Sequence, residues 1–128
     1  MLKTKLRSQK GFTLIEIIAV LVILGIVAAV AVPKYLYIQN EARVKSAKGA
    51  VSEIKGRASS LYATKLLSGS GAQPAVASIV ASLGTDVGTD FDVAAAAQGT
   101  TGILITVGTV QGVGLTTAVT GMWPLPTT

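Results

Sequence analysis

The side chains that could do chemistry in this chain of 128 residues are few, because the sequence contains neither Cys nor His. Without them, the usual nucleophile–base pairs of enzymes and the usual zinc ligand sets cannot be built. No disulfide framework is available either. We therefore expect a protein that is not an enzyme. The most unusual residue is Glu16, because it places an ionisable carboxylate at the edge of a long apolar segment.

The apolar segment runs from Phe12 to Val32, and Glu16 is its one charged side chain. As a helix the segment would be about 31 Å long, which is enough to cross the hydrocarbon core of a bilayer. The residues before it include four bases and no acid: Lys3, Lys5, Arg7 and Lys10. This charge bias predicts that the N-terminus stays in the cytoplasm.

Three interpretations of this segment compete. It could be a permanent membrane anchor, or the apolar part of an ordinary secretory signal peptide. In the second case Ala29-Val30-Ala31 supplies a small-x-small cleavage pattern, and a secreted binding protein would be released after Ala31. The third interpretation is a leader that ends before the apolar segment and leaves that segment in the mature protein.

Glu16 favours the third interpretation. An acid inside a membrane helix costs about 2.5–3.5 kcal/mol and usually marks a function, whereas a discarded signal peptide has no use for one. If the chain were cut after Gly11, Phe12 would carry a free α-ammonium group one helical turn from Glu16. That amine could pair with Glu16 of its own chain or of a neighbouring copy, and a buried charge is tolerable when it is paired.

The stretch Gly11-Phe12-Thr13-Leu14-Ile15-Glu16 follows a short basic leader and precedes an unbroken apolar helix. In this it resembles the processing site of the type IV pilin and pseudopilin superfamily. Gly25 and Pro33 also match the glycine and proline of that family's N-terminal helix. The resemblance covers about residues 1 to 40 and says little about residues 70 to 128.

The resemblance implies a role for each matching residue. A leader of residues 1–11 would be removed after Gly11 by a membrane prepilin peptidase, which would also N-methylate Phe12. Glu16 would pair with the Phe12 amine of an adjacent subunit. Residues 12–33 would hold the subunit in the inner membrane and then form the core of a filament.

The leading functional hypothesis is therefore structural: the chain is the precursor of a type IV pilus subunit. It would be partnered by copies of itself in a helical filament and by inner-membrane assembly machinery. The alternative within this class is a pseudopilin of a type II secretion system. The resemblance implies a bacterial inner-membrane precursor that later enters an extracellular pilus or a periplasmic pseudopilus.

Two features of the apolar helix concern its packing and its end. Gly25 and Ala29 are four residues apart, so they place two small side chains on one helix face, where another helix could approach closely. Pro33 lacks an N–H and clashes with the preceding turn, so it would end the helix or kink it.

Residues 34–67 are expected to form an amphipathic helix that continues the first one, giving one long, bent helix from about 12 to 67. Apolar residues recur there at spacings of three and four, which predicts one buried stripe. The stripe consists of Val44, Ala47, Val51, Ile54, Ala58 and Leu61. Lys45, Lys48, Ser52, Lys55 and Ser59 are expected on the opposite side.

Residues 68–128 are expected to form a small globular head, which begins at the break "SGSGAQP". We expect a short helix at 75–84 and strands at 91–98, 103–110 and 115–123, divided by "GTTG" and "QGVG". The alanine run at 94–97 could instead be helical. An antiparallel sheet of these strands would bury one face against the apolar stripe. The predicted fold class is therefore α+β, a long helix packed on a small antiparallel sheet.

The charges of the chain are divided unevenly. No base follows Lys65, and the acids beyond it are Asp86, Asp90 and Asp92. These carboxylates are weak candidates for a calcium site, since hard cations prefer oxygen ligands; the plainer interpretation is an acidic turn. The acidic head of one subunit could also face the basic helix of another. No other cofactor is expected, and the basic excess near the N-terminus indicates membrane orientation rather than specific nucleic-acid binding.

Overall fold

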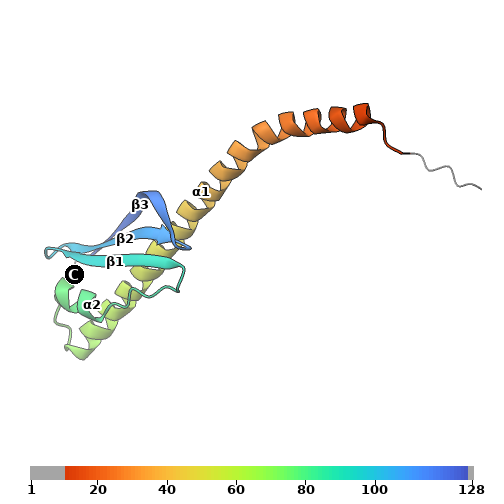
Figure 1. Ribbon diagram of the computed structural model, residues 1–128. Coiled ribbons are helices and arrows are strands. Elements are labelled where there is room, and N and C mark those ends of the chain that lie inside the picture. Colours follow the sequence, from red (N-terminus) through yellow and green to blue (C-terminus); the bar gives the residue numbers. More distant parts are fainter. Residues whose placement is uncertain (1–10, 127–128) are drawn as a thin grey trace, which may run out of the picture. The chain divides into compact units, whose positions relative to one another are not determined.

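The computed structural model describes residues 11–126, so residues 1–10 of the predicted leader and residues 127–128 lie outside the described part. The chain order is a long helix, a short helix and three strands, as Figure 1 shows. Their bounds are α1 Leu14–Ser68, α2 Val76–Ser82, β1 Phe91–Gln98, β2 Gly102–Val110 and β3 Val113–Pro124. This arrangement confirms the predicted α+β class.

The chain divides into two compact units between Ile38 and Gln39. The N-terminal unit contains the apolar part of α1, and its side chains from Leu14 to Ile38 are exposed. The second unit, which we call the head, holds residues 39–126 of the described chain. Helix α1 continues through Pro33, so the proline does not end it.

The head contains one three-stranded antiparallel sheet in the order β1-β2-β3. The central strand β2 is the most buried, with Ile103, Ile105 and Val107 fully inaccessible to solvent. Ile103 pairs with Trp123 of β3 and Ile105 pairs with Gly121. Strands β1 and β3 therefore form the two edges of the sheet.

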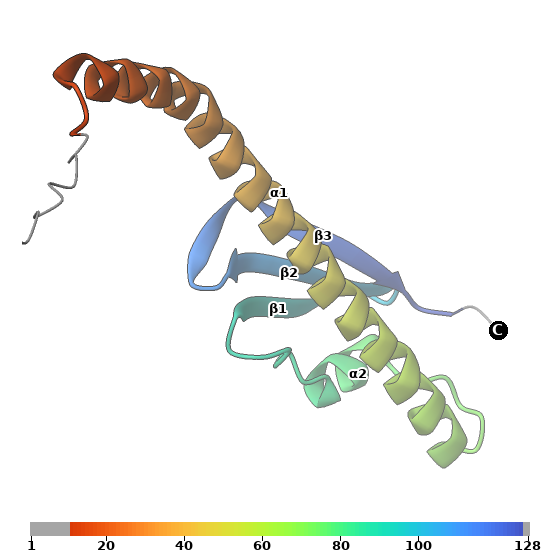
Figure 2. The ribbon, with the colours of Figure 1, turned by 90° about the vertical axis from the view of Figure 1, so that its right-hand side faces the viewer.

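One face of the sheet packs against the head part of α1 (Figure 2), and the buried side chains form one hydrophobic core. The predicted apolar stripe is confirmed, because Ala47, Val51, Ile54 and Ala58 are buried and Val44 and Leu61 are half-buried. Ala50 and Tyr62 widen the buried stripe beyond the prediction. The ring of Tyr62 packs against Trp123 with 6.1 Å between the ring centroids.

Lys55 and Ser59 do not face away from the sheet as the sequence predicts. The Trp123 indole N–H donates a hydrogen bond to Oγ of Ser59 at 2.9 Å. At Gly121, a Cβ would overlap Cγ1 of Val51 and come within 3.0 Å of Cε of Lys55. The prediction fails because β3 reaches past the apolar stripe and also covers the flank of α1, and periodicity gives no measure of the width of the sheet.

Candidate assembly site at the start of the first helix

The first turn of α1 is closed by a reciprocal pair of hydrogen bonds between Thr13 and Glu16. The Thr13 backbone N–H donates to Oε2 of Glu16 at 2.7 Å, and the Glu16 backbone N–H donates to Oγ1 of Thr13 at 3.3 Å. The Thr13 hydroxyl also donates to Oε2 of Glu16, at 2.8 Å. This is a capping box, in which the side chains of a Thr before the helix and of a Glu at its third position each accept a hydrogen bond from the other residue's backbone N–H.

The capping box explains how an ionised acid can stand at the start of an apolar helix. Its carboxylate accepts two short hydrogen bonds and lies at the positive end of the helix dipole. Sequence reasoning identified Glu16 but missed Thr13 as its partner. The signal was present, since Thr-x-x-Glu before an apolar run is the standard sign of a capped helix start.

Gly11 and Phe12 lie just before this capped turn, outside the helix, and both are exposed. The Phe12 side chain is 84% exposed. The bond between these residues is therefore free of helical hydrogen bonding, which suits a cleavage site. In the uncut chain the Phe12 nitrogen is an uncharged amide, so pairing of its amine with Glu16 remains a prediction.

The apolar part of α1 has the length and hydropathy of a membrane span, and it is the one such helix within residues 11–126. None of the residues in its most apolar window is buried. A Cβ at Gly25 would meet nothing within 4 Å, and Ala29 is exposed. The face formed by these two residues is open to another helix, and its use in packing stays a prediction.

Asp86, Asp90 and Asp92 are exposed, and they lie where the chain enters β1. Oδ1 of Asp86 accepts a hydrogen bond from the Gly88 backbone N–H at 2.9 Å, so this carboxylate shapes its own turn. Across the described part of the chain, no group of three Asp, Glu, His or Cys side chains is placed to hold a metal ion. Calcium binding by Asp86, Asp90 and Asp92 therefore stays a prediction without a ligand set to support it.

The loop that carries Asp86 is held by Arg57 of α1. One guanidinium nitrogen, Nη1, donates to the carbonyl oxygens of Asp86 at 2.6 Å and Gly84 at 3.4 Å. The Nε of Arg57 donates to Oε1 of Glu53 at 3.0 Å, which aligns the side chain. This arginine clamp is a contact that the sequence pattern did not predict.

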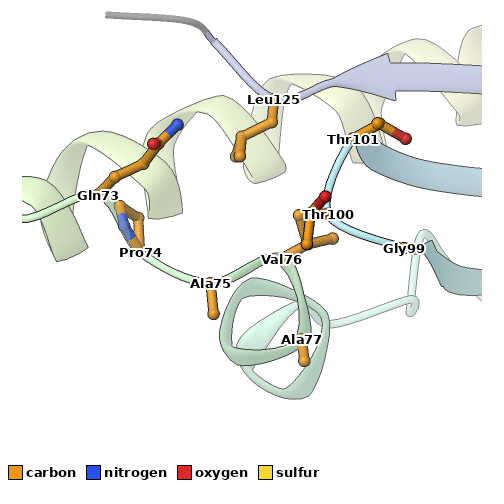
Figure 3. A pocket seen from close by; sticks show the side chains of 9 residues that line it. All are labelled: Gln73, Pro74, Ala75, Val76, Ala77, Gly99, Thr100, Thr101 and Leu125. Atoms are coloured by element: carbon orange, nitrogen blue, oxygen red, sulfur yellow. The ribbon is translucent and has the colours of Figure 1, made fainter.

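One hollow of the head lies between the start of α2, the β1–β2 turn and the chain after β3 (Figure 3). Its volume is about 680 Å³, and Val76, Thr100, Thr101 and Leu125 are among its lining residues. No charged side chain lines it. Gln73 donates from Nε2 to the Pro126 carbonyl at 3.2 Å.

Comparison with known proteins bears on the N-terminal part of the chain. Residues 6–32 match the prokaryotic N-terminal methylation motif. The type II secretion system core protein G of Pseudomonas aeruginosa is 50% identical over 60 residues, which is 47% of this chain and 40% of that protein. A fimbrial protein of Pseudomonas aeruginosa is 44% identical over 55 residues, covering 43% of this chain and 36% of its own length. Fimbrial protein EcpC of Eikenella corrodens is 40% identical over 57 residues, 44% of this chain and 37% of that protein.

The chain thus spans about two fifths of the length of the curated relatives it matches. No solved structure matches it. The matched motif contains the Gly11–Phe12 bond, the capping pair and the apolar helix up to Val32. The N-terminal part of this chain is therefore similar to that of a type II secretion core protein and of fimbrial proteins, which is consistent with the type IV pilin and pseudopilin superfamily.

Proposed function

We propose that this chain is the precursor of a structural subunit that assembles through α1 into a helical filament, namely a type IV pilus. The observation that carries the proposal is the exposed apolar helix that begins at a capped Glu16 inside a methylation motif. The head has its own buried core, so the apolar part of α1 is left for contacts with lipid or with other copies.

The apolar composition of this helix suits both the membrane and the interior of a filament. Before assembly the helix crosses the inner membrane, with the basic leader in the cytoplasm. In the filament it packs among identical helices, which are as apolar as lipid tails. Transfer therefore changes hydrophobic exposure little, and close packing at small residues such as Gly25 and Ala29 decides the association.

Processing prepares the site for assembly. The prepilin peptidase removes residues 1–11 and N-methylates Phe12, which gives the chain an α-ammonium beside the capped turn. The Glu16 carboxylate of an adjacent subunit is the counter-charge for this amine. Away from water, this ion pair stabilises the one alignment of neighbouring subunits in which both charges are paired, because an unpaired charge there is costly.

The second candidate is a pseudopilin of a type II secretion system. The observation that favours it is the 50% identity to core protein G. The matched residues are those at the start of α1, and both kinds of filament would use that segment in the same way. The two candidates therefore differ in where the filament ends: outside the cell or in the periplasm.

Immunogold electron microscopy of cells that produce the chain with an epitope after Thr128 would test both candidates. Label along filaments sheared from the cell surface supports a pilus. Label confined to the periplasm, with loss of protein secretion when the gene is deleted, supports a pseudopilus. A soluble labelled protein that begins at Val32 would overturn both and support the secreted binding protein.

A further inference from the structure

The charged side chains of the head are all acidic beyond Lys65 and mostly basic on the head part of α1, where Glu41 and Glu53 are the two acids. Beyond Lys65 the charged residues are Asp86, Asp90 and Asp92, all exposed. We call these three the acidic loop. On α1, Lys45 and Lys48 are exposed and Lys55 is half-buried; we call these three the basic flank.

These two groups lie at opposite edges of the sheet. Asp92 is in edge strand β1, Asp90 stands directly before it, and Asp86 belongs to the loop held by Arg57. On the other side, Lys48 lines a groove together with β3 residues 114–120, and Lys55 lies against Gly121 of β3. Strand β2 separates β1 from β3, so the acidic loop and the basic flank lie beside different edge strands of one head.

Neither group is neutralised within one copy of the chain. Among residues 11–126, the one ion pair joins Arg57 to Glu53 on α1 itself. Glu41 is the other acid near the basic flank, and it forms no salt bridge. The three lysines therefore keep an excess of positive charge, and the three aspartates keep their negative charge.

The groove beside Lys48 has the shape and donors to receive a carboxylate. It has a volume of about 390 Å³ and is lined by Asn40, Arg43 and Lys48 of α1 and by residues 114–120 of β3. Arg43 donates to Oδ1 of Asn40 at 3.3 Å and has donors left for a second acceptor. Thr116, Thr117 and Thr120 of β3 are among the residues that line it.

We propose that the acidic loop of one copy docks on the basic flank of the next copy, with its carboxylates directed to the groove beside Lys48. The occupant is a second copy of this chain because the complementary charge is carried by the chain itself at the opposite sheet edge. Two different patches on each copy make a head-to-tail contact, which propagates into an open helical assembly. This inference rests on the proposed filament function and names the contact between the heads.

The contact specifies orientation more than it adds affinity. Charge pairs at a partly exposed interface steer encounter, exclude wrong registers and weaken as salt rises. The apolar helices hold the copies together, and the acidic loop with its partner lysines sets how the heads follow one another.

Disulfide cross-linking tests the contact directly, because the natural chain has no Cys. The full chain with both Asp90→Cys and Lys48→Cys is assembled in cells and oxidised, and the filaments are run on a non-reducing gel. We expect a ladder of covalent multimers. Each single variant is expected to give no ladder, and so is Thr100→Cys with Lys48→Cys, because Thr100 lies in the turn at the far end of β1.

Charge reversal provides a second readout. Lys48→Glu places like charges together, and we expect it to lower the yield of filaments by about tenfold or more. Adding Asp90→Lys to the same chain reverses both sides and should restore the yield. Lys65→Glu, an equal charge change near the end of α1, is the matched control and should leave the yield within about twofold.

The failure of this inference can be told from the failure of the proposed function. If the unaltered chain forms filaments but the Cys pair gives no ladder and Lys48→Glu assembles normally, the head contact is wrong and the filament function stands. If the unaltered chain forms no filament under any condition, both are overturned.

Discussion

Thr13 and Glu16 are joined by hydrogen bonds at the start of α1. The backbone N–H and the hydroxyl of Thr13 both donate to Oε2 of Glu16, at 2.7 and 2.8 Å. The acid therefore has a structural role before any second subunit arrives. Capping and charge pairing are separable roles for the same side chain, because a cap needs an acceptor oxygen whereas pairing with an amine needs a negative charge.

Substitution of Glu16 separates these roles. Glu16→Gln keeps an acceptor for the capping box but loses the charge, and Glu16→Ala loses both. We expect both variants to stay in the membrane fraction and both to lower filament yield by about tenfold or more, since the Phe12 amine is left unpaired. Cell fractionation and quantification of sheared filaments would measure this. Normal filaments from Glu16→Gln would show that the cap, and not the charge, is what assembly uses.

Gly121→Ala should destabilise the head. The added methyl overlaps Cγ1 of Val51, which is fixed in the core, so β3 or α1 has to move. Such overpacking costs about 1–3 kcal/mol of the free energy of unfolding. Urea unfolding of the full chain in detergent, followed by the fluorescence of Trp123, the single tryptophan, would measure it.

The matched control for Gly121→Ala is Gly114→Ala in the same strand, where a Cβ meets nothing within 4 Å. We expect its change to stay within about 0.5 kcal/mol. Pairing Gly121→Ala with Val51→Ala should cost less than the sum of the single changes, because the second substitution removes the clash. Strict additivity would contradict the contact.

Ser59→Ala should destabilise the head although Ser59 itself is exposed. The substitution leaves the indole N–H of Trp123, a residue that is 5% exposed, without its acceptor. The expected loss is about 1–3 kcal/mol in the free energy of unfolding, measured by the same urea titration. Ser60→Ala, one residue along the helix, is the control and is expected within about 0.5 kcal/mol of the unaltered chain. An equal effect of the two changes would argue against the hydrogen bond.

Arg57→Ala should loosen the loop before β1 without unfolding the head. It removes the donors to the carbonyls of Gly84 and Asp86, a loss of about 1 kcal/mol, which corresponds to roughly a fivefold rise in local opening. Hydrogen exchange of the backbone amides at 85–90 would detect it. Glu53→Gln breaks only the ion pair with Arg57 and should change the exchange little. Unchanged exchange in Arg57→Ala would show that the loop is held by its own turns.

Much of the fold follows from local pattern. The predicted long helix, about 12 to 67, compares with Leu14–Ser68, and the predicted strand 91–98 matches β1. The alanine run at 94–97 is a strand because it pairs with β2, whose β-branched residues fix the sheet. Periodicity and turn residues suffice here, since each element presents one clear apolar face.

The contacts that could not be predicted are those between elements far apart in the sequence. Nothing in the sequence near Ser59 indicates Trp123 as its partner, because the two residues are brought together by the register of β3. The same holds for Gly121 against Val51 and for Arg57 against the loop before β1. The capping partner Thr13 is different, because the pattern Thr-x-x-Glu that indicates it lies within four consecutive residues.

The central claim is that the apolar helix stays in a protein that has been cut after Gly11 and prepared for assembly. Mass spectrometry of the intact protein isolated from its native cells tests this most directly. We predict a mature chain that begins at Phe12 and is one methyl group heavier than the unmodified sequence 12–128. A chain that begins at Val32, or one that keeps Met1 and the leader in the assembled protein, would contradict the account.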